Sequence, residues 1–172
     1  NIKVNLVTGK GDALLTRLVN EGRNSPADVL LTVDAGRLYR AQESDVLQPV
    51  EDETINKMVP ENLKSVDNMW FGLSIRARVI MFAKDRVNES ELDSYESLGD
   101  DKWKGRICIR SSSNIYNQSL VAGMISQNGL EKTENWLQKF TNNFARKPTG
   151  GDRDQIKAVA AGECDIAVSN SY

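Results

Sequence analysis

The stretch "GRICIRSSSNIYNQSL" (residues 105–120) decides how the chain should fold, because it joins a strand pattern directly to a helix pattern. Its first part is a short apolar run flanked by arginines, which is typical of a buried strand. Serines and an asparagine follow at residues 111–114, and these residue types cap helix N-termini. The pattern then predicts a helix to about Asn128, ended by Gly129. A strand that leads straight into a helix is the repeating unit of α/β folds.

Toward the N-terminus, the same alternation of strand and helix patterns repeats. Residues 2–7 alternate apolar and polar side chains and residues 28–33 ("DVLLTV") form a short apolar run, so both are predicted as strands. Residues 11–22 predict a helix with leucines on one face, and residues 34–42 predict another, with an aspartate at its N-cap position. The polar, proline-bearing residues 47–67 are predicted to be irregular or short-helical.

Toward the C-terminus, the patterns predict an apolar strand at 79–83, helices at 131–140 and 152–162, and a closing strand at 164–169. Strands that alternate with helices predict an α/β fold with mostly parallel sheets and flanking helices. Such groups lie on both sides of residues 71–83, so we expect two lobes, residues 1–78 and residues 79–172. Both ends of the sequence lie within strand patterns, and we therefore expect two incomplete lobes within a segment of a longer chain.

The composition predicts a soluble globular protein. Of the 172 residues, 40% are hydrophobic and 27% are charged, and the formal net charge is −2. The lysines and arginines are scattered, whereas nucleic acid or an anionic membrane would favour a basic stripe, so neither partner is expected. No run approaches the roughly 18 apolar residues that a membrane span requires. No signal peptide opens the sequence.

The sequence contains no histidine, which limits the chemistry that these residues can perform. Ser-His-Asp and Cys-His catalysis and histidine-rich zinc sites are excluded, and no nucleophile with a partnering base is visible, so an enzyme is not expected. The two cysteines, Cys108 and Cys164, form no CxxC pair. They are either a disulfide formed in an oxidising compartment or two buried thiols.

Polar side chains gather where three predicted strands end, and open α/β sheets bind ligands at the carboxyl ends of their strands. Asp34 follows one strand, where it caps a helix, and residues 111–116 and 170–172 follow two others. If the last two strands are neighbours, Tyr116 and Tyr172 emerge on the same rim. A phenolate is a hard oxygen ligand that suits Fe(III). The alternative is that these tyrosines pack their rings and leave their hydroxyl groups to water.

Other polar residues near these strand ends have both a binding and a structural interpretation. The helix start at Ser112, Ser113 and Asn114 offers backbone N–H groups to an anion, but these residue types also cap ordinary helices. Arg78, in "SIRARVI", could hold a carboxylate, carbonate or phosphate, and the alternative for it is a surface ion pair.

At these residues the chain resembles the ferric-iron-binding periplasmic proteins of bacterial ABC transporters, which have a two-lobed fold of the type II periplasmic-binding class. The resemblance covers nearly the whole chain, and four stretches carry it: "SPADVLLTVDAGRLYRAQ" (25–42), "WFGLSIRARVIMFAKDRV" (70–87), "WKGRICIRSSSNIYNQSL" (103–120) and "DRDQIKAVAAGECDIAVSNSY" (152–172). It implies a periplasmic, monomeric binding protein that captures Fe(III) in an interlobe cleft. It further implies delivery of the ion to an inner-membrane ABC permease.

Residue by residue, the resemblance implies that Tyr116 and Tyr172 are tyrosinate ligands of the ferric ion. It also implies a synergistic anion, such as carbonate, beside the metal. The residues that match the anion site are Arg78, Ser112, Ser113, Asn114 and, most loosely, Asn170. The alternative within the same fold is a binding protein for another small anion or organic solute, with the tyrosines only lining the cleft.

Overall fold

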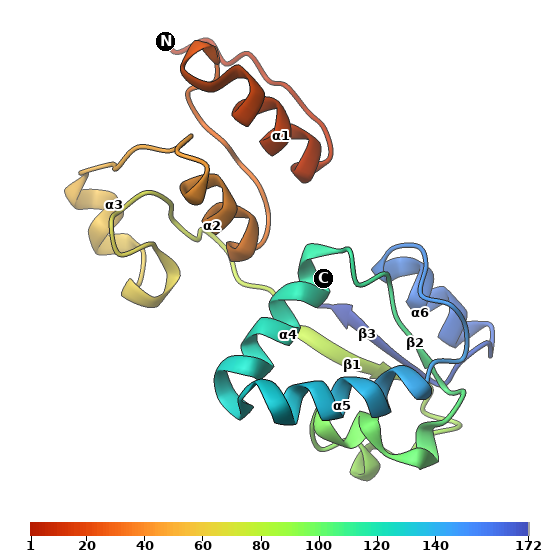
Figure 1. The fold of residues 1–172 in the computed structure, drawn as a ribbon. Helices are drawn as coiled ribbons and strands as arrows, with labels where there is room; N and C mark the ends of the chain where they lie inside the picture. The colour runs from red at the N-terminus through yellow and green to blue at the C-terminus, as the bar shows by residue number, and fades with distance from the viewer. Residues whose placement is uncertain (172) are drawn as a thin grey trace. The chain divides into compact units, whose positions relative to one another are not determined.

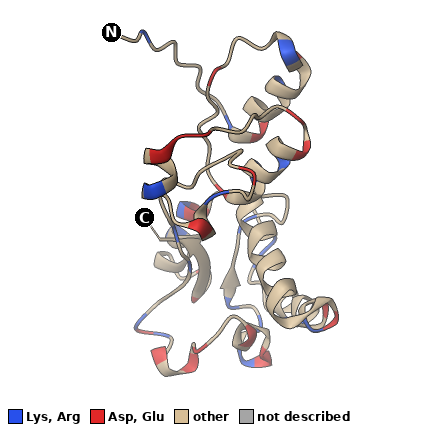
Figure 2. Cartoon of the chain, turned by 90° about the vertical axis from the view of Figure 1, so that its left-hand side faces the viewer, with Lys and Arg blue, Asp and Glu red and all other residues tan. Residues whose placement is uncertain are grey.

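The computed structural model describes residues 1–171 and divides the chain into two compact units, which adjoin in sequence at Ile75 and Arg76 (Figure 1). Among these residues, the first unit is built from helices and irregular segments, and the second contains a β-sheet. Basic and acidic residues are interspersed along the chain, as Figure 2 shows. No helix within residues 1–171 is long and apolar enough to cross a bilayer.

The first unit contains α1 (Gly11–Glu21), α2 (Ala35–Glu43) and α3 (Glu53–Met58), with 3-10 turns at Gly22–Asn24 and Glu61–Leu63. Local capping explains where these helices begin and end. The Asp34 carboxylate accepts a hydrogen bond from the backbone N of Gly36 at 2.9 Å, which begins α2 as predicted. Asp52 accepts from the backbone N of Ile55 at 2.9 Å and begins α3. Gly22 ends α1 with a positive φ of 52°, a conformation that glycine adopts without strain.

The prediction of two strands in the first unit is wrong for the described residues. Residues 2–7 and 28–33 belong to no sheet, and Val29 and Leu31 are 81% and 79% exposed. An alternating or apolar pattern produces a strand only where a partner strand completes its hydrogen bonds and a packed layer covers one face. No segment within residues 1–171 supplies that partner, so both segments stay irregular and largely exposed.

The sheet of the second unit consists of β1 (Arg78–Phe82), β2 (Ile107–Cys108) and β3 (Ile166–Asn170), in the order β1-β3-β2. β2 runs parallel to β3, with Cys108 opposite Ala167, whereas β1 runs antiparallel to β3, with Arg78 opposite Asn170. The sheet is therefore mixed, whereas the sequence pattern predicts a mostly parallel one. The cause lies in the connections. Helices cross from β2 to β3, as a parallel pair requires, whereas the segment between β1 and β2 contains 3-10 turns and no α-helix that would cross the sheet.

Three helices pack on the sheet, namely α4 (Ile115–Asn128), α5 (Leu130–Asn142) and α6 (Asp152–Ala160); 3-10 turns lie at Glu89–Glu91, Glu96–Gly99 and Asp101–Trp103. α4 and α5 cover one face, because Met124, Trp136 and Phe140 cluster with Ile107 and Ile166 (Figure 1). α6 covers the other face through alanine and valine side chains that pack beside the disulfide. The alternation of side chains along β2 and β3 thus supplies both layers.

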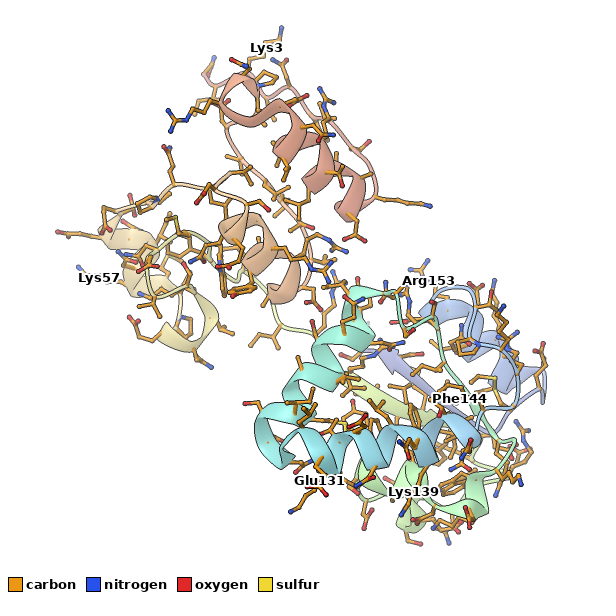
Figure 3. The ribbon with its side chains drawn as sticks, viewed as in Figure 1. Lys3, Lys57, Glu131, Lys139, Phe144 and Arg153 are labelled. Carbon is orange, nitrogen blue, oxygen red and sulfur yellow. A yellow bond between two sulfur atoms is a disulfide. The ribbon has the colours of Figure 1, made fainter. Side chains whose placement is uncertain are left out.

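The core of the second unit is dominated by aromatic side chains. Trp103 is fully buried, and Trp136 stacks on Phe140 with ring centroids 4.7 Å apart. Phe140 in turn meets Phe144 edge-on at 5.0 Å between centroids; Phe144 is labelled in Figure 3 near the end of α5. Burying rings of this size is the largest apolar contribution available to a unit of about one hundred residues.

The two cysteines form a disulfide, which decides between the two alternatives that the sequence left open. Cys108 in β2 and Cys164, just before β3, are bonded with an S–S distance of 2.02 Å and lie 56 residues apart in sequence. The bond joins the last residue of β2 to a residue two positions before β3. Disulfides form and persist in oxidising compartments, so this one is compatible with a protein that works outside the cytoplasm.

Candidate functional site

The candidate site lies where β2 and β3 end. These strands are parallel neighbours, which meets the condition that the sequence analysis left open, so the residues that follow them meet at one edge of the sheet. Tyr116 is in the first turn of α4, which follows β2, and Asn170 is the last residue of β3. Tyr172, the second predicted iron ligand, lies outside the residues that the structure describes.

The serine-rich turn before α4 forms hydrogen bonds within itself. The side-chain oxygen of Asn114 accepts from the backbone N of Tyr116 at 3.0 Å, and this caps the helix. The hydroxyl oxygens of Ser111 and Ser113 are 2.9 Å apart, and Gln118 donates to the carbonyl of Ser112 at 3.2 Å. The capping interpretation accounts for these contacts, and the exposed Ser112 and Ser113 remain accessible at the helix start.

The half-buried ring of Tyr116 lies under two guanidinium groups. The Cζ of Arg110 is 5.3 Å from the ring centroid and the Cζ of Arg78 is 5.8 Å from it. Both distances are within the range of cation–π attraction. The two arginines therefore hold positive charge beside the phenol that the sequence singles out as a metal ligand.

Arg78 is itself held in place by hydrogen bonds on both of its terminal nitrogens. Nη1 donates to the Asn170 side-chain oxygen at 2.8 Å and to Asp152 at 3.1 Å. Nη2 donates to the Asn117 side-chain oxygen at 2.6 Å and to the Val168 carbonyl at 3.2 Å. The side chain is only 9% exposed. Arg78 is thus a buried connection between β1, β3 and α4, with its terminal nitrogens engaged by protein acceptors.

Sequence reasoning missed Asp152 and Arg110 at this site, and Asp152 makes the more numerous contacts. Its buried carboxylate pairs with Arg78 and with Arg110, each at 3.1 Å, and accepts from the backbone N of Asn170 at 2.9 Å. No local pattern marks it, because Arg110 and Arg78 lie 42 and 74 residues away in the chain. Its position at the first turn of a predicted helix was the only signal, and many solvent-exposed aspartates share it.

The hydroxyl group of a second tyrosine of this unit is engaged by the protein backbone. The Tyr95 hydroxyl donates to the backbone carbonyl of Arg78, and burial raises the pKa of this phenol, with the nearby Arg78 cation opposing that shift. Among residues 1–171, no three His, Cys, Asp or Glu side chains gather as a metal site would require. The phenol of Tyr116 lies at the strand ends, and a phenolate is a hard oxygen donor.

Comparison with known proteins places the chain in a class. Residues 24–172 match the family of bacterial extracellular solute-binding proteins, and the chain belongs to this family. Among curated relatives, iron uptake protein A1 of Synechocystis is 56% identical over 99% of this chain and 48% of its own length. Iron uptake protein A2 of the same organism is 47% identical, over 99% of this chain and 49% of its own length. The chain thus spans about half the length of the curated relatives it matches.

Solved structures agree with this assignment. A Trichodesmium protein named IdiA or FutA, in complex with iron and citrate, is 58% identical and superposes with a TM-score of 0.93, over 99% of this chain and 54% of its own. The ferric binding protein of Campylobacter jejuni is 37% identical with a TM-score of 0.94, over the same shares of the two chains. The predicted family and the α/β fold of a partial two-lobed protein are therefore confirmed.

Proposed function

We propose that the protein is a periplasmic solute-binding protein that binds Fe(III) through tyrosinate oxygens and delivers it to an ABC importer. Tyr116 and Tyr172 are the proposed ligands, and the two compact units are the proposed lobes. The observation that carries the proposal is the half-buried phenol of Tyr116 at the carboxyl ends of β2 and β3, with two arginines beside its ring. Relatives whose names state ferric iron binding support it.

The charges at the site favour an anionic ligand for the metal. A phenol becomes a metal ligand when a strongly charged cation displaces its proton, and two guanidinium groups lie beside the ring of Tyr116. Fe(III) is a hard cation that prefers such oxygen donors over nitrogen or sulfur. Because binding releases phenol protons, iron affinity should fall as the pH falls.

We also propose that a small anion, such as carbonate or citrate, completes the coordination of the metal. Ser112, Ser113 and Asn114 would receive it at the start of α4, where the exposed serines and the helix dipole favour negative charge. Asn170 and Arg78 would act from the opposite side of the rim, by orienting each other through their 2.8 Å hydrogen bond. The proposed state of the protein is a monomer without enzymatic activity.

Titration of the protein with ferric citrate tests this function. A tyrosinate-to-iron charge-transfer band should appear in the visible spectrum, and Tyr116→Phe should weaken or shift it. Tyr39→Phe is the matched control, because Tyr39 is a 56% exposed tyrosine of the first unit. A colourless wild-type protein that binds another anion or organic solute would favour the alternative of a different small ligand.

A further inference from the structure

The second unit contains a buried cluster of two arginines and one carboxylate, which we call the Asp152 cluster: Arg78, Arg110 and Asp152. The side chain of Asp152 is fully buried, and those of Arg78 and Arg110 are 9% and 19% exposed. The cluster carries one more positive than negative charge. The buried Nε atoms of both arginines have no hydrogen-bond partner among the described residues. Removing these charges from water costs free energy, so packing alone does not explain the cluster.

The Asp152 cluster connects every segment that borders the candidate site. Asp152 begins α6, close to Arg153, which is labelled in Figure 3. Its two arginines come from the start of β1 and from just after β2. Asp152 also accepts the backbone N–H of Asn170, at the end of β3. One carboxylate therefore fixes β1, β3, α6 and the turn before α4 with respect to one another.

The same carboxylate determines where the two guanidinium groups lie over Tyr116. Asp152 uses one oxygen for Arg110 and the other for Arg78, and both arginines lie within 6 Å of the phenol ring centroid. Without the carboxylate, the two largely buried guanidinium groups would lose their shared counter-ion and repel each other, so their positions over the ring would change.

We propose that Asp152 is a positioning residue for iron binding, which holds Arg78 and Arg110 against Tyr116 and fixes the backbone of Asn170. Asp152 does not touch the metal in this proposal, and it acts through the arginines and through the end of β3. The inference rests on the proposed function, since it assigns a role to Asp152 in orienting the tyrosine that would bind the ion. Supporting residues of this kind typically contribute about 10- to 100-fold to metal affinity.

The chain offers a matched control for this proposal at the opposite end of β3. Asp165 also bridges two arginines, with Oδ1 2.6 Å from Nε of Arg86 and Oδ2 2.6 Å from Nε of Arg106. It precedes β3, whereas the Asp152 cluster lies at the end of that strand. Asp152→Asn and Asp165→Asn therefore remove the same kind of bridge from the same unit, and only the first borders Tyr116.

The test compares these two variants with wild-type protein in three measurements. The first is the position and intensity of the charge-transfer band, and the second is iron affinity by competition with citrate. The third is the ¹⁹F NMR resonance of fluorotyrosine at position 116 in iron-free protein, assigned with Tyr116→Phe. We expect Asp152→Asn to shift the band and the resonance and to weaken affinity at least about tenfold. Asp165→Asn should leave all three at wild-type values.

Two results would overturn the proposal. One is a folded Asp152→Asn variant with wild-type band, affinity and resonance; the other is an Asp165→Asn variant that changes these measurements equally. If Asp152→Asn does not fold, Arg110→Gln takes its place in the same measurements. This variant removes one guanidinium from the ring and keeps the pair of Asp152 with Arg78, and wild-type band, affinity and resonance would then overturn the proposal. A wild-type protein without any charge-transfer band refutes the proposed function instead, and the iron-free resonance then still decides whether Asp152 positions the ring.

Discussion

The two units of the chain differ in how their apolar residues are used. In the first unit, the buried apolar side chains among the described residues are Leu15, Ala41 and Val59. The second unit buries an aromatic-rich cluster on one face of its sheet and a smaller aliphatic cluster on the other face. It also contains a disulfide. Both units have strand and helix patterns in their sequence, yet only in the second do the strands find partners.

This difference shows that a strand pattern in the sequence predicts a strand only where a partner strand is available. β1 and β3 form because each meets a neighbour of matching register, with Arg78 opposite Asn170 and Phe82 opposite Ile166. Residues 28–33 have an equally apolar pattern, but no strand in residues 1–171 pairs with them. A helix differs in this respect, because its hydrogen bonds are satisfied within the segment. Accordingly, the helices of the first unit form without a sheet.

The largest expected effect is the loss of a core tryptophan from the second unit. Trp103→Ala should lower the free energy of unfolding by about 3–5 kcal/mol, because the fully buried ring would leave a cavity. Trp70→Ala is the matched change in the first unit, where the ring is half-buried and its Nε1 donates to Gln42 at 3.0 Å. This change should cost less, and urea unfolding followed by circular dichroism measures both. Equal losses would show that the first unit has a comparable core.

Removing the disulfide should have the next largest effect. Cys108→Ala combined with Cys164→Ala should lower the free energy of unfolding by about 2–4 kcal/mol, because the unfolded chain loses a constraint that closes a long loop. Reduction of the wild-type protein should reproduce the effect. Hydrogen exchange should rise in β2, β3 and the helices between them, and it should stay unchanged in α1 and α2. A rise in α1 and α2 would show that the effect of the disulfide is not confined to the second unit.

Acidification should weaken the second unit through Asp165. Burial opposes its ionisation, but hydrogen bonds from Arg106 and Arg86 outweigh burial and lower its pKa. A lowered folded pKa contributes stability that is complete above about pH 4 and is lost as the pH falls through the folded value. Asp165→Asn should therefore cost on the order of 1 kcal/mol at pH 7 and progressively less below pH 4, by urea unfolding at several pH values.

Asp12 is the control for this pH effect in the first unit. A hydrogen bond from Arg37 lowers its pKa, but the Asp12 side chain is 63% exposed, so solvent screens the pair. Asp12→Asn should leave the dependence of unfolding on pH close to that of the wild-type protein. The comparison would be reversed if Asp12→Asn flattened this dependence more than Asp165→Asn does.

The smallest expected effect concerns the apolar segment of the first unit. Leu31→Ser in the 172-residue chain should change the free energy of unfolding by less than about 0.5 kcal/mol, because Leu31 is 79% exposed. Ile166→Ser, at a fully buried position of β3, is the contrasting change and should lower the stability of the second unit far more than Leu31→Ser does. A large loss from Leu31→Ser would mean that residues 28–33 are covered in solution.

Sequence reasoning predicted most of what depends on neighbouring residues. The cap at Asn114, the helix to Asn128 and the end at Gly129 agree with the structure to within a residue, because local hydrogen bonds specify them. The sequence left open whether β2 and β3 are neighbours, and the structure pairs them in parallel. The sequence did not predict the antiparallel direction of β1, since that direction depends on where the chain enters the sheet.

For the candidate site, the sequence singled out Tyr116 and Arg78, but it did not reveal the contacts that connect them. The structure places the guanidinium of Arg78 near the Tyr116 ring, and the sequence analysis assigned both residues to one site. Asp152 connects Arg78 with Arg110 across long sequence separations, and a single sequence carries no pattern for such a contact. Buried charge clusters of this kind require coordinates, since each member alone is an ordinary surface residue type.

The disulfide also changes what a cut in the backbone would do. It spans α4, α5 and the exposed turn around Lys147, so a protease that cleaves between the two cysteines leaves both fragments covalently attached. Both parts of the rim, Tyr116 on one fragment or the other and Asn170 at the end of β3, would remain on one molecule. On a non-reducing denaturing gel, a nicked protein would run as a single band, and the two fragments would separate only after reduction.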